Sequence, residues 1–376
     1  MWLVILTLAL ATAVAGMIYL ISRVSKFSFI QKIIQSKSPF WGKIVSAIIV
    51  VAVATLLCVI LGIMNAIIVF INLAGIWLIC DFAAHVAALF ATHKCKINEK
   101  YQRVYYAGII AIALTALYLG FAYYNAVHVV MTEYKIEVGE NIQPLKIALI
   151  ADSHVGTTMS GDDFSRYIDE IAQKNPDVLV IAGDLFDDST SREDMILSCA
   201  ALGEIETKYG VFYSFGNHDR GYNSEESRGY DADEFTSRLR EEGVVVLEDE
   251  IVNIGDDYCI IGRKDKNQSD RKSISELMGM VEPGRYSIVL DHQPSDYDEE
   301  ESAGCNLVLS GHTHGGQMIP ITYVGEWIGA NDATYGYERR GNTDFIVTSG
   351  IGDWELLFKS GCKSEYVMIN ISNDGA

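Results

Sequence analysis

The sequence predicts an all-helical membrane domain of about four helices, followed by an α/β domain in which two sheets pack together as a sandwich. A break in composition carries the first part of this prediction. The first 126 residues are largely apolar and hold nine basic and two acidic residues, whereas the rest holds 20 basic and 47 acidic residues, a formal charge of −27. In this acidic part, short β-branched runs alternate at first with helical patterns and later follow one another. We place the membrane domain at 1–131, a linker or first strand at 132–144, and the α/β domain at 145–376.

Four segments of the first part are long and apolar enough to span a bilayer, which takes about 20 residues. They are residues 2–22, two helices within 44–90 that turn near 62–65, and residues 105–130. We prefer a retained first helix to a cleaved signal peptide, because no basic residue precedes its apolar run.

The loops at 23–43 and 93–103 are both basic. Basic loops stay on the cytoplasmic side, and four spans then put both the N-terminus and the residues after 130 outside. We therefore predict a multi-pass protein of the cell membrane with an extracytoplasmic α/β domain. The reverse topology is the alternative.

Asp81 and His85 lie four residues apart in the third span. An ionisable pair in a membrane segment is a functional hypothesis by default. We prefer the other interpretation, a local hydrogen bond near a helix end. The acidic domain is unsuited to nucleic acid, which needs a basic surface. An anionic substrate would need local positive charge there, most simply from bound metal.

The α/β domain begins with the buried strand KIALIA at 146–151. Helices are predicted near 162–174, 191–207 and 234–242. Further strands are predicted at 177–182, 211–215, 244–247, 258–262, 286–290, 306–310, 344–348 and 366–371. Because this order begins βαβαβ and ends mostly in strands, two packed sheets with helices outside fit best.

Polar clusters follow five of these strands. They are Asp152-Ser153-His154, Gly183-Asp184, Gly216-Asn217-His218-Asp219, Asp291-His292 and Gly311-His312-Thr313-His314. All five histidines of the α/β domain fall in these clusters. Because ligands bind beyond the carboxyl ends of strands in such sheets, we expect these side chains to meet at a metal site. The glycines allow sharp turns and close approach of the backbone.

In this order and spacing, the five motifs resemble those of the calcineurin-like metallophosphoesterase family, over residues 145–371. The form Gly-His-Thr-His-Gly-Gly-Gln at 311–317 and the late segment at 350–371 are similar to a bacterial membrane-associated branch. Some relatives in that branch act on UDP-2,3-diacylglucosamine. The resemblance does not extend to the helical part.

The resemblance implies a site for two divalent cations bridged by Asp184. One cation would be held by Asp152, His154, Asp184 and His314, and the other by Asp184, Asn217, His292 and His312. Mixed nitrogen and oxygen ligands suit Mn, Fe, Zn or Co and do not choose among them. Such a pair clamps the attacking and leaving oxygens of an in-line displacement, and metal-bound hydroxide is the nucleophile.

We assign His218 to the transition state, where it would bind phosphoryl oxygens or protonate the departing oxygen. Asp219 could fix the tautomer of His218, with a loop hydrogen bond as its alternative role. Asp187 and Asp188 are expected to cap the helix that begins near residue 190.

The sequence thus predicts a membrane-anchored, metal-dependent hydrolase of a phosphodiester, pyrophosphate or phosphomonoester. Anchoring favours a lipid-linked or envelope substrate, although it could serve location alone. The alternative is a membrane sensor or scaffold whose phosphoesterase-like domain binds a ligand or partner. Several apolar side chains after the last motif could line a lipid-facing rim, but we expect them in the core: Trp327, Ile328, Trp354, Leu356, Leu357 and Phe358.

Overall fold

The computed structural model describes residues 2–36, 38–91, 105–222 and 228–373. The chain forms two compact units, Met1–Phe121 and Ala122–Ala376. The expected basic loop at 93–103 lies outside the described residues.

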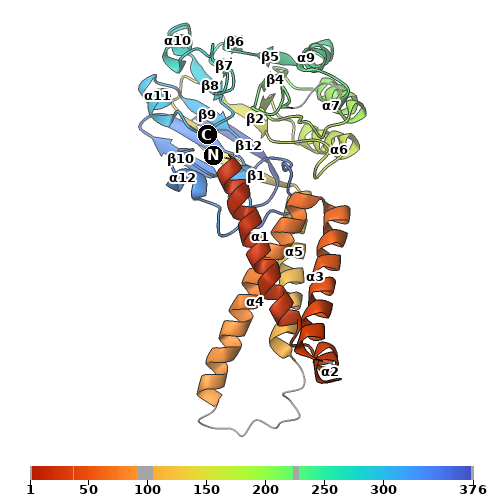
Figure 1. The fold of residues 1–376 in the computed structure, drawn as a ribbon. Coiled ribbons are helices and arrows are strands. Elements are labelled where there is room, and N and C mark those ends of the chain that lie inside the picture. Colours follow the sequence, from red (N-terminus) through yellow and green to blue (C-terminus); the bar gives the residue numbers. More distant parts are fainter. Residues whose placement is uncertain (1, 37, 92–104, 223–227, 374–376) are drawn as a thin grey trace. The chain divides into compact units, whose positions relative to one another are not determined.

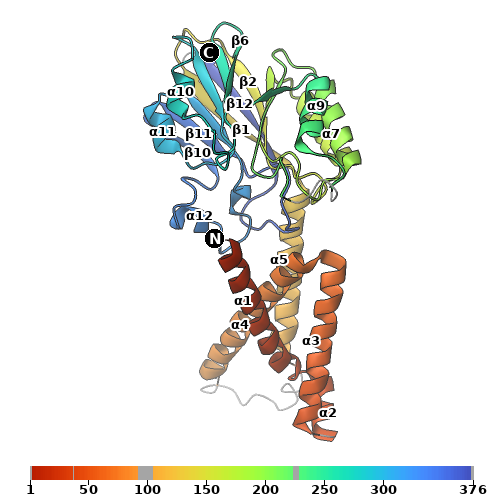
Figure 2. The same cartoon turned by 45° about the horizontal axis from the view of Figure 1, so that its top comes forward.

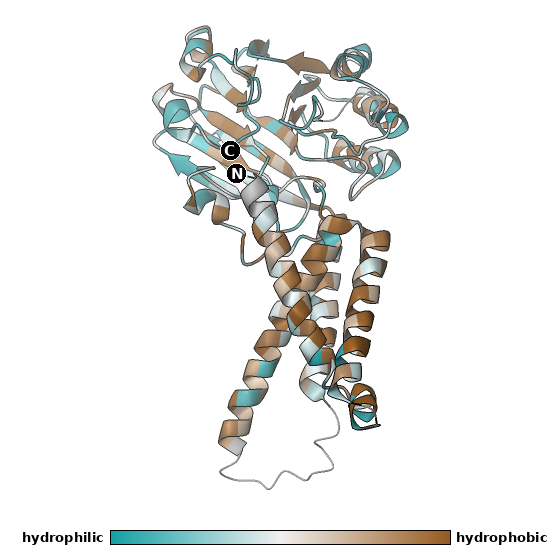
Figure 3. Ribbon diagram, viewed as in Figure 1, coloured by the Kyte–Doolittle hydropathy of each residue, from teal (hydrophilic) through white to brown (hydrophobic). Residues whose placement is uncertain are grey.

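The first unit is helical (Figure 1). Its helices are α1 (Trp2–Val24), α2 (Ser28–Ser36), α3 (Pro39–Leu61), α4 (Ile63–Ala91) and α5 (Tyr106–Val127), of which the last turns belong to the second unit. Four of the described helices, α1, α3, α4 and α5, are long and apolar enough to cross a membrane, as Figure 3 shows by colour. The prediction of about four apolar helices is confirmed. The break between α3 and α4 falls at Gly62, whose φ of 81° suits glycine.

Asp81 of α4 binds side chains from other segments of this unit. Its carboxylate accepts hydrogen bonds from the Tyr105 hydroxyl at 2.5 Å and the Tyr19 hydroxyl at 3.1 Å, and it pairs with Arg23 Nε at 2.9 Å. His85 is exposed on the same helix. The structure therefore favours an ion pair between segments over both interpretations of Asp81 and His85 in the sequence.

The second unit is built on two six-stranded sheets. The first sheet has the order β1-β12-β2-β3-β4-β5. Its strands are β1 (Val130–Val138), β12 (Glu365–Asn373), β2 (Leu145–Ile150), β3 (Val178–Ala182), β4 (Val211–Ser214) and β5 (Val245–Leu247). The strands β2 to β5 are mutually parallel, whereas β12 runs antiparallel to β2 and parallel to β1.

Most of the range 132–144, for which we left linker and first strand open, belongs to β1. The reason is visible in its pattern, because Ile136 and Val138 are buried in the core between the sheets. This strand makes residues from 130 onward part of the folded α/β unit.

The second sheet has the order β10-β11-β9-β8-β7-β6. Its strands are β10 (Gly336–Arg340), β11 (Thr343–Val347), β9 (Leu307–Ser310), β8 (Tyr286–Leu290), β7 (Tyr258–Gly262) and β6 (Glu250–Ile254). The two edge strands, β6 and β10, were not expected. Both are partly exposed, so they lack the continuous buried apolar run by which central strands are found.

Helices cover the outer faces of both sheets (Figure 2). The helices α6 (Gly161–Ala172), α7 (Arg192–Glu204) and α9 (Ala232–Glu241) pack on the first sheet, and α10 (Ile274–Met278) and α11 (Tyr297–Ser302) on the second. Between the sheets, Leu149 and Val180 meet Ile288 and Leu309 in a third apolar cluster. The predicted two-sheet α/β fold is confirmed, as a four-layer sandwich.

Candidate metal centre

Strand ends deliver every candidate ligand to one edge of the sandwich. Asp152 and His154 follow β2, Asp184 follows β3, Asn217 and His218 follow β4, His292 follows β8, and His312 and His314 follow β9. The two sheets meet at this edge, because His292 Nδ1 lies 2.8 Å from the carbonyl oxygen of Ala182 at the end of β3. The clusters that sequence spacing placed at strand ends therefore lie together.

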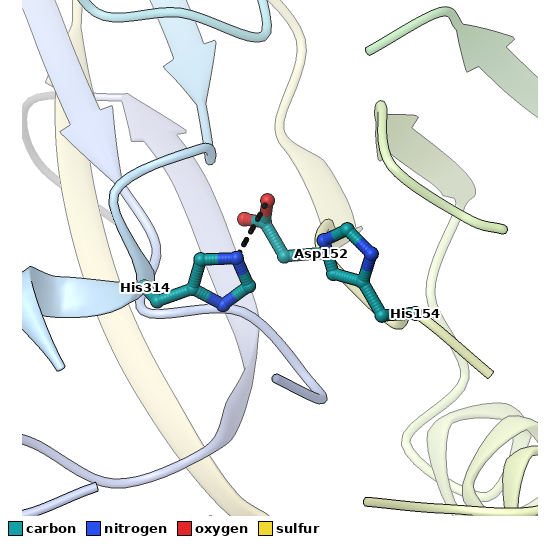
Figure 4. Close-up of side chains that lie close together, drawn as sticks. All are labelled: Asp152, His154 and His314. Carbon is teal, nitrogen blue, oxygen red and sulfur yellow. Dashed lines mark ion pairs between the residues drawn. The ribbon is translucent and has the colours of Figure 1, made fainter. Parts of the chain in front are cut away.

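One group of ligands consists of Asp152, His154 and His314, all buried (Figure 4). Their ligand atoms lie within 4.8 Å of one another. His314 Nε2 is 3.8 Å from Asp152 Oδ1, and the centroids of the His154 and His314 rings are 5.1 Å apart. This spacing suits one cation between a carboxylate and two imidazoles.

A second group consists of Asp184, His292 and His312, with the same 4.8 Å limit between ligand atoms. Asp184 Oδ2 is 3.1 Å from His292 Nε2 and 3.5 Å from His154 Nε2. The other oxygen, Oδ1, accepts a 2.8 Å hydrogen bond from the backbone N–H of His218. Asp184 is thus fixed by one oxygen and faces both groups with the other.

The backbone at this edge adopts a conformation that side chains other than glycine rarely take. Five candidate ligands have positive φ: Asp152 (51°), His154 (38°), Asp184 (52°), His312 (72°) and His314 (49°). Such strain persists only where the surroundings enforce it, and it gathers at functional sites. Close packing adds to it, because a Cβ on Gly216 would lie 2.2 Å from Asp184 Oδ1.

Several buried polar atoms of the cluster have no hydrogen-bond partner among the described residues. Four of them belong to candidate ligands: His154 Nε2, His292 Nε2 and Asn217 Oδ1, and also His314 Nδ1, which lies 3.3 Å from Asp353 Oδ1. A buried polar atom without a partner is costly, so each such atom in a folded protein needs an explanation. Two imidazole nitrogens and an amide oxygen beside buried carboxylates fit divalent cations with mixed nitrogen and oxygen ligands.

Comparison with known proteins identifies the family. A family model described as calcineurin-like phosphoesterase matches residues 145–316. An uncharacterized metallophosphoesterase of Aquifex aeolicus is 30% identical over 188 residues, which cover 48% of this chain and 67% of that protein. The chain belongs to the calcineurin-like phosphoesterase family.

Two further relatives extend the comparison. An uncharacterized metallophosphoesterase of Helicobacter pylori strain J99 is 29% identical over 233 residues, which are 60% of either chain. A transmembrane protein with metallophosphoesterase domain from Danio rerio is 26% identical over 280 residues, 69% of this chain and 62% of that protein. The chain thus spans about 60% of the length of each of these two relatives.

Two carboxylates lie behind the imidazoles of the first ligand group. We did not assign either of them to the metal centre from the sequence. His154 Nδ1 lies 3.0 Å from Asp187 Oδ2, and His314 Nδ1 lies 3.3 Å from Asp353 Oδ1. Asp353 in turn pairs with the fully buried Lys359, whose Nζ is 3.0 Å away. Carboxylates behind ligating imidazoles fix the ring and raise its basicity.

The cap expected from Asp187 and Asp188 is wrong. Ser191 caps α7, and its side chain accepts a hydrogen bond from the backbone N–H of Asp194. Asp187 instead binds His154, and Asp188 Oδ2 accepts a 3.0 Å hydrogen bond from the N–H of Tyr222. The sequence offered one signal for this role, namely that Asp187 is a second carboxylate only three residues after the candidate ligand Asp184.

Asp219 makes loop hydrogen bonds, which was the alternative to fixing the tautomer of His218. Its oxygens accept four backbone hydrogen bonds of 2.7–3.1 Å, from Asp184, Leu185, Phe186 and Gly216. These bonds tie the turn after β3 to the turn after β4. The structure therefore favours a loop-holding Asp219 that positions Asp184 over one that fixes the tautomer of His218.

Electrostatics at the cluster favour bound positive charge. Burial lowers the pKa of His154 and of His292, but Asp187 and Asp184 outweigh it and raise the pKa of both imidazoles. Burial, reinforced by neighbouring histidines, lowers the pKa of His312 and of His314 to about 3, which leaves them neutral and able to bind metal. The pKa of Asp184 is lowered by His292 and His154 although burial opposes this.

His218 borders the cluster on its half-buried side. Its ring centroid is 5.1 Å from that of His154, 5.0 Å from that of Tyr222 and 4.8 Å from that of Trp354. Burial lowers the pKa of His218. The aromatic rings of Tyr222 and Trp354 thus flank His218, the one histidine of the cluster that we assigned to substrate.

The core expected of the late apolar residues is only partly present. Phe358 is buried, and Trp354, Leu356 and Leu357 are not fully buried. Trp327 and Ile328 are 73% and 56% exposed, so their assignment to the core was wrong. Both lie at the end of the short helix α12 (Val324–Trp327), after the 3₁₀ turn η2 (His314–Gly316).

Proposed function

We propose that this chain is a membrane-anchored hydrolase of phosphoric esters with a centre for two divalent cations. Asp152, His154, Asp184 and His314 would hold one cation, and Asp184, Asn217, His292 and His312 the other. The observation that carries this is Asp184 Oδ2, which lies 3.1–3.5 Å from an imidazole nitrogen of each group while neither nitrogen has another partner among the described residues.

Bound divalent cations supply Lewis acidity and lower the pKa of water towards neutrality. The chain's own residues then have defined tasks. Asp219 and the His218 N–H keep Asp184 in place, so that its second oxygen can face both cation positions. Asp187 orients His154, and Asp353 places a negative charge 3.3 Å from the His314 ring.

His218 is proposed to meet the phosphoryl group. Its backbone N–H is fixed on Asp184, while its ring reaches the half-exposed side of the cluster between Tyr222 and Trp354. From there the imidazole can donate a hydrogen bond to a phosphoryl oxygen or give a proton to the departing oxygen.

The domain is proposed to lie outside the cytoplasm. The basic segment at 23–43 supports this, because the positive-inside rule places it on the cytoplasmic side and four spans bring residue 130 to the other. A reporter fused to the C-terminus tests it: alkaline phosphatase fusions should be active and cytoplasmic reporters inactive. An active cytoplasmic reporter would reverse the topology.

The first test is hydrolysis of bis(p-nitrophenyl) phosphate and p-nitrophenyl phosphate by the full-length protein in detergent. We expect turnover that depends on added Mn and stops with chelator. Asp184→Asn should reduce turnover by at least about 10²-fold, the usual cost of one preorganised electrostatic group. The ratio of diester to monoester rates would narrow the substrate class.

The matched control is Asp169→Asn, the same chemical change on the exposed face of α6. It should leave both turnover and metal content unchanged. If Asp184→Asn binds metal and acts like the native protein, the two-cation centre is wrong. A folded protein that binds metal and phosphate esters without turnover would favour the sensor or scaffold.

A further inference from the structure

The edge that carries the metal centre is also the edge at which the membrane helix enters the phosphoesterase domain. α5 is one continuous helix to Val127, and only His128 and Val129 separate it from β1. Val130 is paired with Glu365, so β1 and β12 begin side by side. Because β12 is antiparallel to β2, with Val367 opposite Leu149, the beginnings of both strands lie beside the end of β2, where the first ligands follow.

Hydrogen bonds fix the last turns of α5 to the loop that precedes β12. Lys359 N–H donates to the carbonyl of Ala122 at 2.9 Å, and Ser364 N–H donates to that of Asn125 at 3.0 Å. The Ser364 hydroxyl donates to the carbonyl of Ala126 at 2.8 Å. All of these residues belong to the second unit. An α5 that spans the bilayer therefore holds the loop at 359–364 near the membrane surface.

The same loop holds the segment that follows the last metal ligands. The N–H groups of Ser360 and Gly361 donate to the carbonyl of Gln317 at 2.8 and 3.0 Å. The free thiol of Cys362 adds a third contact, since its Sγ lies 3.2 Å from the carbonyl oxygen of His314. Residues 314–317 are thus tied to a loop that is itself tied to the end of α5.

Beyond this anchor, residues 321–328 expose large apolar side chains. Ile321, Tyr323, Trp327 and Ile328 are 56%, 53%, 73% and 56% exposed. An exposed apolar group of this size in a domain with a charge of −27 marks an interaction surface. Tryptophan and tyrosine are the residues that favour the membrane–water interface.

We propose that residues 321–328 are a membrane-docking loop, whose Ile321, Tyr323, Trp327 and Ile328 side chains insert into the interface of the bilayer that α5 crosses. The occupant is lipid and not an acidic or basic protein, because Glu326 is the only charged residue of the segment. Docking is therefore apolar and insensitive to salt. The metal centre would then open at the membrane surface. Access for a phosphoester on a membrane-embedded amphiphile follows only if the proposed function also holds.

The test uses the full-length protein, one copy per lipid nanodisc, with acyl chains brominated near the headgroup or left unbrominated. The chain has five tryptophans, so the contribution of Trp327 is the emission lost in Trp327→Phe. We expect bromine to quench most of that contribution, equally at low and high salt. The matched control is Met280→Trp in the Trp327→Phe background, because Met280 is 55% exposed and lies shortly before the start of β8, at the opposite edge. The emission gained at position 280 should not respond to bromine.

Equal emission of Trp327 in both lipids would overturn the proposal. Emission that is blue-shifted but not quenched would also overturn it, because protein and not lipid would then cover the loop. Fluorescence requires neither bound metal nor turnover. A chain that fails to hydrolyse phosphate esters can therefore still show quenching of Trp327. A chain that hydrolyses them can still fail to show it.

Discussion

The two ligand groups of the metal centre differ in what stands behind their imidazoles. In the first, a carboxylate lies beside each ring: Asp187 is within hydrogen-bond distance of His154 Nδ1 at 3.0 Å, and Asp353 Oδ1 lies 3.3 Å from His314 Nδ1. In the second, His292 is held by the neutral carbonyl of Ala182, and Asn217 donates a 3.0 Å hydrogen bond to the Tyr222 hydroxyl. Because a carboxylate makes an imidazole a stronger ligand, the first position should hold its cation more tightly than the second.

The largest effect is expected from Lys359→Met, which removes the partner of Asp353. Both groups are fully buried, and a buried carboxylate that loses its cation costs about 3–5 kcal/mol. Thermal unfolding of the full-length protein should show this loss. Lys363→Met, an exposed lysine of the same loop, is the control and should change little.

A double variant sharpens the interpretation. Adding Asp353→Asn to Lys359→Met should recover part of the lost stability, because it removes the uncompensated charge. If the double variant is no more stable than the single one, lost packing and not charge explains the effect.

Asp187→Asn should weaken the first position alone. Loss of the carboxylate behind a ligating histidine costs about 10–100-fold in metal affinity. We expect metal analysis after dialysis to find one cation where the native protein keeps two. Loss of the second cation, with the first retained, would mean that the second position does not bind its cation more weakly than the first.

A smaller effect is expected from Tyr222→Phe on the second position. It removes the hydroxyl that accepts a hydrogen bond from Asn217, at a net cost of about 1 kcal/mol, or about fivefold in affinity. Titration of the weaker cation by calorimetry measures this. Tyr209→Phe, at a tyrosine outside the cluster, should leave both affinities as they are.

A pH-dependent effect is expected from Glu300, which lies behind the second group. Arg263 Nη1 contacts Glu300 at 3.4 Å and Asp291, next to His292, at 2.6 Å. Burial and then Asp291 raise the pKa of Glu300 well above its usual 4.5. A raised carboxyl pKa favours the folded state below the unfolded pKa, and this contribution is lost as pH rises through the folded pKa.

Stability should therefore fall as pH rises from about 4.5, and Glu300→Gln should reduce that slope. Thermal unfolding of the two proteins across this range makes the comparison. Parallel curves would mean that Glu300 keeps its usual pKa beside Arg263.

The sequence located most of the α/β fold because its central strands are buried on both faces. Runs such as VLVIA at β3 and YSIVL at β8 can be read as strands without any partner in view. The edge strands β6 and β10 were not predicted, since their partly exposed faces leave no continuous apolar run. The short helices α10 and α11 were not predicted either, because so few residues show no helical period.

By itself, the sequence determined that the chain has an apolar helical part and an acidic α/β part, and which side chains follow each strand. Those are local properties, set by composition and by the order of motifs. Only the tertiary structure decided what stands behind each ligand. Asp187 binds His154 across 33 positions, Asp219 holds the turn of Asp184, and Trp327 lies on the surface of the domain instead of in its core. Each of these depends on how distant turns meet at one edge, and spacing along the chain does not encode that.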